Sequence, residues 1–301
     1  MRRNVWIAII VASVGWGTGG PGTRKAFGEG LDPYALVSLR SLVAAGAVMV
    51  YLLVRSGNLP SSPLVWRVGF VQGIANLAVP YILFTLAYQH ASAGFVGLLA
   101  ALIPITTAAL AHYLLADEPL HAAKLIGMAL AFGGVAVLAL SGDSGLAEGG
   151  NPGLAILLGS IAVVVLSLGG IYAKHHAGNY DAIELTWVQF ATGTSVIIVA
   201  MMIAEGFPRF GDITGYGWTL VVYLGLAASF MPFALFFWML RHTSVGHASL
   251  VGYLVPIVSV TVGAVWLSEQ LQPGIVVGGA LILAGVLMAD RAERRFVAPR
   301  P

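Results

Sequence analysis

The side chains that could bind a small solute lie inside long apolar runs. Asn76, Tyr81 and Phe84 continue around one side of a single predicted helix, together with Pro80. The amide and the phenol can hydrogen-bond the amino and carboxylate groups of a solute, while Phe84 and Trp16 supply apolar contact. Asn76 has a second interpretation, because an amide in lipid also bonds neighbouring helices. The aromatic surroundings favour an amphiphilic or aromatic solute over a bare ion.

One permanent charge lies well inside an apolar run. Arg40 is about 10 Å from the start of its run if the helix begins near Tyr34. Such a charge must face protein or water. It could be the counter-ion of a solute carboxylate. It could also be a structural anchor that bonds backbone carbonyls or reaches Asp32.

The composition requires a bilayer around these residues. Hydrophobic side chains make up 58% of the 301 residues and charged ones 9%, far below the quarter usual in soluble domains. Ten apolar runs are long enough to cross a membrane as helices. They span 4–21, 34–54, 66–88, 92–115, 121–140, 152–173, 183–204, 216–240, 244–267 and 273–289. An all-α protein with ten transmembrane helices is predicted.

Several functions are excluded by what the sequence lacks. It has no cysteine, no H-E-x-x-H pattern, no phosphate-binding glycine loop and no pair of intramembrane aspartates. The net charge of +2 is too small and too scattered for nucleic acid. We expect no enzyme activity, no cofactor and no metal. The expected partners are a small-molecule substrate and membrane lipid, with a monomer or homodimer as the assembly.

The chain repeats itself once. Five matched pairs occur in the same order in both halves: Lys25 with Lys174, Pro80 with Pro232, His90 with His242, Pro104 with Pro256, and Glu118 with Glu269. Arg40 matches Gln189, so the charge is not required in both halves. The predicted units are residues 1–145 and 146–290, followed by a basic cytoplasmic tail, 291–301.

Because each unit has five helices, the second unit is inverted relative to the first. If the N-terminus is cytoplasmic, eleven of the fifteen Lys and Arg residues face the cytoplasm and three face outside, with Arg40 in a span. This asymmetry predicts that both termini are cytoplasmic. Arg2 and Arg3 before an apolar run also describe a signal peptide, but no cleavage site follows and the run has an internal counterpart.

The first run ends in a stretch rich in glycine and proline, residues 16–25. We expect this helix to be irregular toward its end and to border a cavity in the bundle, since freed backbone groups are tolerated only beside a cavity or protein. Trp16, at the start of the stretch, is either a cavity residue or part of an interfacial belt. The fifth and tenth helices lack central polar residues, so we expect them at the periphery.

Residues near both repeat ends carry a family resemblance. Gly15-Trp16-Gly17, Lys25, Asp32-Pro33 and Arg40, with the stretches from Pro104 to Gly134 and from Pro256 to Gly285, resemble the EamA domain of the drug/metabolite transporter superfamily, from Asn4 to Ala289. Within it the chain is most similar to the YddG type of amino-acid and drug exporter. Leu102 and Ile103 depart from this type, because more aromatic members have larger side chains there.

The resemblance implies export of amino acids and related metabolites or drugs across the cytoplasmic (inner) membrane, by alternating access through a central cavity. It implies substrate contact by Trp16 and Tyr81, and less directly by His90 and Tyr253. Two sets of residues are therefore predicted: substrate-binding Trp16, Asn76, Tyr81, Phe84, His90 and Tyr253, and structural or gating Arg40, Lys25, Lys174, Pro104 and Pro256. The alternative function is a non-transporting membrane sensor or assembly protein.

Overall fold

The computed structural model describes residues 3–60, 62–114, 122–147, 149–176, 181–242 and 250–297. All regular elements in these ranges are helices, and ten helical stretches are long and apolar enough to cross a membrane. In chain order they are α1 (Arg3–Phe27), α2 (Pro33–Ser56), α3 (Pro63–Gln72), η1 (Gly73–Ala78), α4 (Val79–His90), α5 (Ala93–Ala100), α6 (Ile103–Leu114), α7 (Ala122–Ser141), α8 (Pro152–His176), α9 (Ala182–Ala204), η2 (Phe210–Asp212), α10 (Gly215–Gly225), η3 (Leu226–Phe230), α11 (Met231–His242), α13 (Leu250–Leu267) and α14 (Pro273–Val297). The predicted all-α fold is confirmed.

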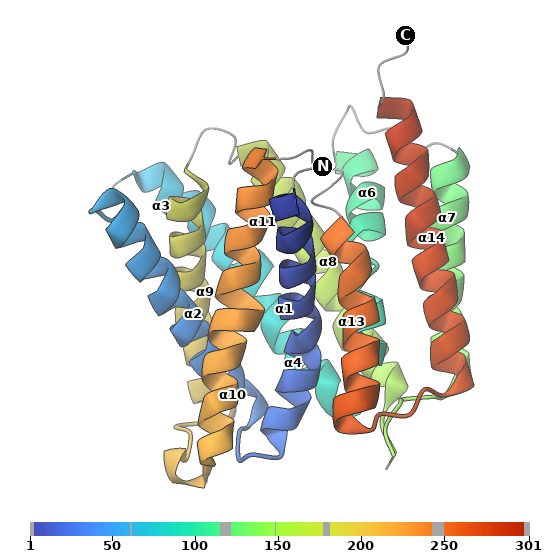
Figure 1. Cartoon of the computed structure of the whole chain (residues 1–301), viewed down its shortest axis with the longest axis horizontal. Coiled ribbons are helices and arrows are strands. Elements are labelled where there is room, and N and C mark those ends of the chain that lie inside the picture. Colours follow the sequence, from blue (N-terminus) through green and yellow to red (C-terminus); the bar gives the residue numbers. More distant parts are fainter. Residues whose placement is uncertain are drawn as a thin grey trace.

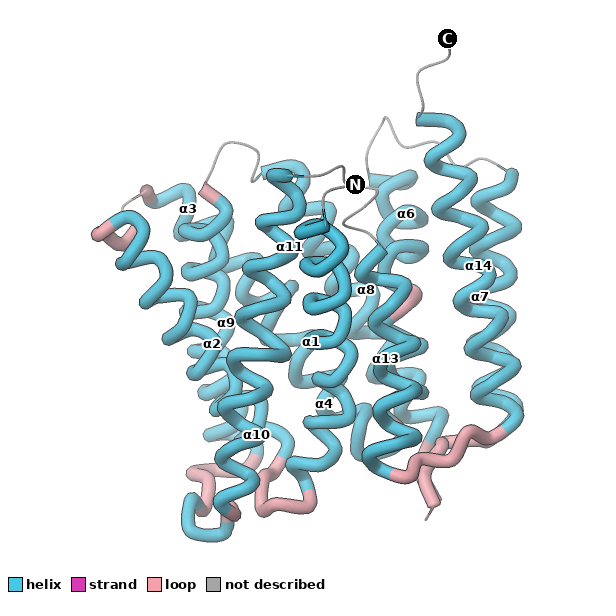
Figure 2. The backbone as a smooth tube through the Cα atoms, viewed as in Figure 1, coloured by secondary structure: helices cyan, strands magenta, loops and turns pink. Residues whose placement is uncertain are grey.

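The bundle has two distinct ends (Figure 1). α1 begins and α14 finishes at the same end, which we call the proximal end. The loops after α1 and α9, and the loop between α13 and α14, lie at the opposite, distal end (Figure 2). An even number of crossings explains why both termini are at one end. The tail predicted from residue 291 begins as a continuation of α14, which runs to Val297.

The inverted relation of the halves is visible in the pairing of α7 with α14 at one edge of the bundle (Figure 1). A Cβ on Gly127 would lie 2.6 Å from the carbonyl oxygen of Gly285, and one on Gly134 would lie 2.5 Å from that of Gly278. The earlier glycine of one repeat therefore meets the later glycine of the other, as a twofold axis between antiparallel helices requires. Small residues allow this close backbone approach in lipid.

The expectation of an irregular first helix is wrong. α1 is helical from Arg3 to Phe27 with Pro21 inside it. Most of its glycines serve packing, because a Cβ on them would lie within 3 Å of other helices. The distances are 2.5 Å from Gly17 to Val258 of α13, 2.8 Å from Gly20 to the Tyr88 hydroxyl of α4, and 2.9 Å from Gly22 to Leu224 of α10. Contacts on all sides stabilise a helix that propensity alone disfavours.

Two π-helical segments occupy matching places in the two repeats. η1 ends two residues before Pro80, and η3 ends two residues before Pro232. Proline lacks an amide hydrogen and clashes with the carbonyl four residues earlier, and a wider turn relieves that clash. Both repeats therefore carry a widened turn at the middle of their third span.

The other matched prolines behave differently. Pro104 is the second residue of α6, directly after the turn at Ala101 and Leu102 that ends α5. Pro256 is buried within the continuous helix α13. The fourth span is therefore interrupted just before its proline, whereas the ninth span is a continuous helix through its proline.

Candidate functional site

Helix α2 carries Arg40 into the middle of the bundle, where it is only 8% exposed. Its Nη1 donates to Thr23 Oγ1 of α1 at 3.2 Å, and its Nη2 donates to Ser229 Oγ of η3 at 3.0 Å. Its Cζ lies 5.0 Å from the ring centroid of Tyr81 in α4. Arg40 bonds hydroxyl groups rather than Asp32 or a carbonyl, and it connects three other spans.

Aromatic rings from both repeats gather around Trp16. The ring of Phe233 meets it edge-on at 5.3 Å between centroids, and that of Phe236 lies at 5.7 Å. Phe233 also meets the buried ring of Phe190 at 5.6 Å. Tyr81 packs against the same buried cluster as Phe233. The structure therefore brings Trp16, Tyr81 and Arg40 into one central region, which we call the central site.

Asn76 lies at the contact between η1 and α8. Its side-chain amide donates to Gln72 Oε1, and the Gln72 amide donates to the carbonyl of Gly169 at 2.9 Å. The first bond lies within one span, and the second joins that span to α8. The Asn76 Oδ1 atom is buried and has no hydrogen-bond partner, and it faces α8, where a Cβ on Gly169 would lie 2.1 Å from it.

The remaining predicted substrate residues do not pack in the cluster beside Arg40. Phe84 and Tyr253 pack against a second buried cluster that includes Phe95 and Leu99. His90 is the last residue of α4, and its backbone carbonyl accepts from the amide of Asn151 at 3.0 Å. Their roles stay predictions, with His90 located at the distal end.

The two matched lysines give less information. Lys25 Nζ lies 3.7 Å from Oε1 of Glu29, in the turn after α1, and the Lys25 side chain is 40% exposed. The side chain of Lys174 lies outside the described part of the structure. A gating role for either stays a prediction.

A buried ion pair joins the two repeats at the distal end. Arg24 Nε lies 2.9 Å from Glu269 Oε1, and Arg24 Nη1 donates to the carbonyls of Tyr88 and Ala91 at 2.8 and 3.1 Å. Glu269 also accepts from the amide of Ala93 at 2.9 Å, at the start of α5. Burial raises the pKa of the Glu269 carboxyl, although the Ala93 amide and Arg24 pull it down. This distal ion pair was not predicted.

Three residues around Arg40 were also missed. Tyr88 follows Tyr81 by seven residues, two helical turns, and Thr23 follows Trp16 by the same interval. This spacing could have placed both on the faces already chosen. No such spacing could have identified Ser229. The π-helical turn of η3 changes the direction in which its side chains point.

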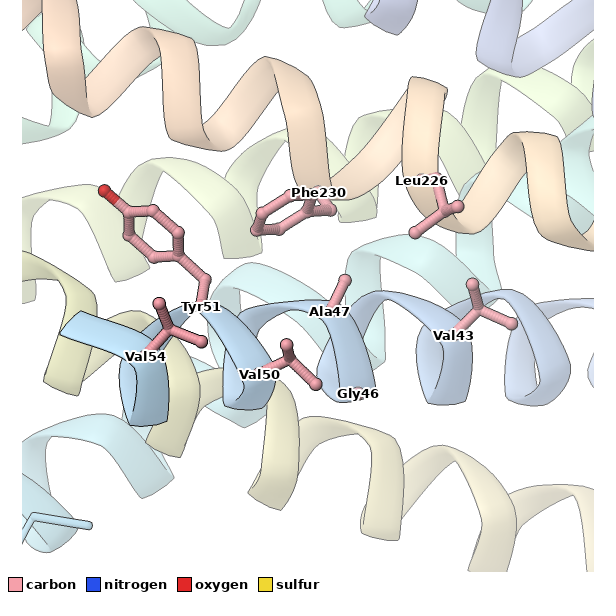
Figure 3. Close-up of a pocket in the computed structure, with 8 residues that line it drawn as sticks. All are labelled: Val43, Gly46, Ala47, Val50, Tyr51, Val54, Leu226 and Phe230. Carbon is pink, nitrogen blue, oxygen red and sulfur yellow. The ribbon is translucent and has the colours of Figure 1, made fainter. Parts of the chain in front are cut away.

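A separate groove lies on the outside of the bundle between α2 and α10–η3 (Figure 3). Its volume is about 490 Å³, and it is lined by Val43, Gly46, Ala47, Val50, Tyr51, Val54, Leu226 and Phe230. Val54 is 83% exposed, so the groove opens on the surface that faces lipid. It contains none of the predicted site residues.

The described residues contain no group of three or more His, Cys, Asp or Glu side chains that could hold a metal ion. The central site offers one guanidinium, several hydroxyls and aromatic rings. These groups suit the binding of a solute with one anionic and one apolar part.

The chain is similar to known transporters and to a solved structure. The chain is 28% identical to the probable terminal-alkyne amino-acid exporter of Streptantibioticus cattleyicolor, over 97% of this chain and 94% of that one. It is 22% identical to the uncharacterized transporter YvbV of Bacillus subtilis over 97% and 93% of the two chains. A solved crystal structure has the same fold, with a TM-score of 0.66, 20% identity and coverage of 99% and 100%.

The family match covers both repeats separately. The EamA-like transporter family matches residues 4–140 and again residues 153–289, which together include all ten spans. The protein is therefore a multi-pass membrane protein with a small-molecule substrate, and it belongs to the EamA-like transporter family.

Proposed function

We propose that the protein exports amino acids and related small amphipathic metabolites or drugs across the cytoplasmic membrane. The observation that carries this proposal is the central site, where Arg40 lies beside an aromatic region built from both repeats. A solute with a charged head and an apolar body matches such a site. The relative from Streptantibioticus cattleyicolor bears the name of an amino-acid exporter.

Alternating access supplies the mechanism in this proposal. Inverted repeats give two related states, in which the central site opens toward opposite sides of the membrane. The matched π-helical turns of η1 and η3 supply a deformable segment on each side of this site. The Arg24–Glu269 pair holds the distal end together in the state described. With eleven of fifteen basic residues on the side of the termini, the proximal end is cytoplasmic.

Within this function, Trp16 and Tyr81 contact the substrate directly. Phe84 and Tyr253 complete the apolar wall from the neighbouring cluster, and Asn76 supplies a polar contact from η1. His90, the last residue of α4, contacts the substrate at the distal end in this proposal. Pro104 and Pro256 bend the fourth and ninth spans as the site changes its facing.

Purified protein in liposomes tests the proposal. Counterflow of labelled leucine, phenylalanine and propargylglycine, a terminal-alkyne amino acid, should exceed that of empty liposomes, with and without an imposed pH gradient. Trp16→Ala and Tyr81→Ala should lower flux at least fivefold while the protein stays folded. Trp6→Ala is the matched control, because Trp6 is on the same helix with 47% of its side chain exposed.

No counterflow for a broad panel of amino acids, amines and drugs would contradict transport and favour a sensor or assembly protein. Unchanged flux in both aromatic variants would contradict only the location of the site.

A further inference from the structure

The guanidinium of Arg40 has unused hydrogen-bonding capacity. A guanidinium has five N–H donors, and two are used here, by Thr23 and Ser229. Arg40 Nε is buried and has no hydrogen-bond partner. An unused buried donor of this kind is unfavourable unless a partner binds to it.

The positive charge is also uncompensated. Within the described ranges no carboxylate lies within 4 Å of Arg40, whereas Arg24, Lys25 and Arg55 each pair with one. Hydroxyls are neutral, and the Tyr81 ring, whose centroid lies 5.0 Å from Arg40 Cζ, contributes a cation–π attraction but no counter-charge. A buried charge needs a counter-charge more than it needs further dipoles.

Helix α1 presents a glycine to this group. A Cβ on Gly19 would lie in ordinary contact, 3.9 Å from Arg40 Nη2 and 3.7 Å from Ala228 Cβ, so no side chain at position 19 covers the guanidinium. Trp16 is one turn earlier on the same helix, about 5 Å along the axis. This separation matches the distance between the carboxylate of an amino acid and the middle of its side chain.

We propose that the Arg40 guanidinium binds the carboxylate of the transported solute, with the solute's apolar side chain directed toward Trp16. Two parallel N–H···O bonds from Nε and a terminal nitrogen satisfy both oxygens and compensate the charge. The protein therefore selects amphipathic carboxylates over the corresponding amines. This inference rests on the proposed function and adds the group that the site recognises.

Paired ligands test the selection. Tryptophan fluorescence and thermal shift of the purified protein would measure binding of phenylalanine against 2-phenylethylamine, and of propargylglycine against but-3-yn-1-amine. Each pair differs by the carboxylate alone. The wild type should bind the acids at least tenfold more tightly. Arg40→Gln should reduce this preference to about onefold while it keeps amine binding, and Arg40→Lys should lie between them.

Arg55→Gln is the control for loss of a basic residue, because Arg55 pairs with Asp181 at the protein surface; it should keep the full preference. A wild type that binds acids and amines equally would overturn the inference. So would an Arg40→Gln variant, folded by size-exclusion chromatography, that weakens acids and amines equally, since that is the result of a structural role. If Arg40→Gln does not fold, loss of the preference in Arg40→Lys supports the inference and full retention overturns it.

The proposed function is tested separately by counterflow. Amino-acid flux without any carboxylate preference would leave transport in place and remove Arg40 as the anchor.

Discussion

Two arginines of the same bundle, one partly buried and one fully buried, are satisfied in different ways. Arg24, at the distal end, has the carboxylate of Glu269 and two backbone carbonyls. Arg40, in the central site, has two hydroxyls and one aromatic ring. Removing a partner from a compensated buried charge is strongly destabilising, whereas an uncompensated charge is itself unfavourable. The comparison separates an arginine that stabilises the fold from one that is available to a ligand.

The largest expected effect comes from breaking the compensated pair. Glu269→Gln should lower the free energy of unfolding by about 2 kcal/mol, less than the ~3–5 kcal/mol of a fully buried pair, because the Arg24 side chain is 23% exposed. Denaturant titration in mixed micelles would measure it. The double variant Arg24→Gln/Glu269→Gln should lose less than the sum of the two single changes. Strict additivity would mean that the pair contributes nothing.

A second prediction concerns Tyr88, which connects the two regions. Its carbonyl accepts from Arg24 and its hydroxyl packs against Gly20. A Cβ on Gly20 would lie 2.8 Å from that hydroxyl, so Gly20→Ala should lower stability by about 1–2 kcal/mol through overpacking. Gly19→Ala is the matched control, since its nearest atom would lie 3.7 Å away. Equal melting temperatures for the two variants would contradict this packing.

Much of this comparison could be predicted from the sequence. The ten spans, the duplication and the buried position of Arg40 follow from hydropathy and from matched residues, because lipid leaves few ways to arrange an apolar helix. Pairing of Gly127 with Gly285 and of Gly134 with Gly278 follows from the same repeat.

The rest depends on packing between helices distant in sequence. The glycines of α1 suggested a broken helix, since helix propensity does not show that neighbours fill the space around them. The distal ion pair joins residues 245 positions apart, so no local pattern reveals it. Ser229 faces Arg40 only through the π-helical turn of η3, which the position of Pro232 suggests but does not fix.

A third prediction gives the opposite result for the uncompensated arginine. Arg40→Gln should change the free energy of unfolding by less than about 1 kcal/mol, because the loss of two hydrogen bonds is offset by the release of a buried charge. The same titration would measure it beside Glu269→Gln. A loss as large as that of Glu269→Gln would show that Arg40 stabilises the fold, and the comparison would fail.

The smallest expected effect is a dependence of stability on pH. Burial raises the pKa of Glu269, so the folded protein binds more protons than the unfolded chain between the ordinary value of 4.5 and the raised one. Stability contributed by this group is therefore highest at low pH and declines as pH rises through that window. Melting temperatures from pH 4 to 7 should show a shallower decline in Glu269→Gln. Glu205, whose pKa burial also raises, contributes to the decline that remains.

Asp181 supplies the control of opposite sign. Burial would raise its pKa, but the Ile183 amide and Arg55 outweigh burial and lower it. The stability that Asp181 contributes is therefore lost only as pH falls below the ordinary pKa of 3.8. Asp181→Asn should leave the profile between pH 5 and 7 unchanged. If Asp181→Asn and Glu269→Gln flatten the same pH range, the distal carboxylate is not the buried group described, and Arg24 loses the partner that distinguishes it from Arg40.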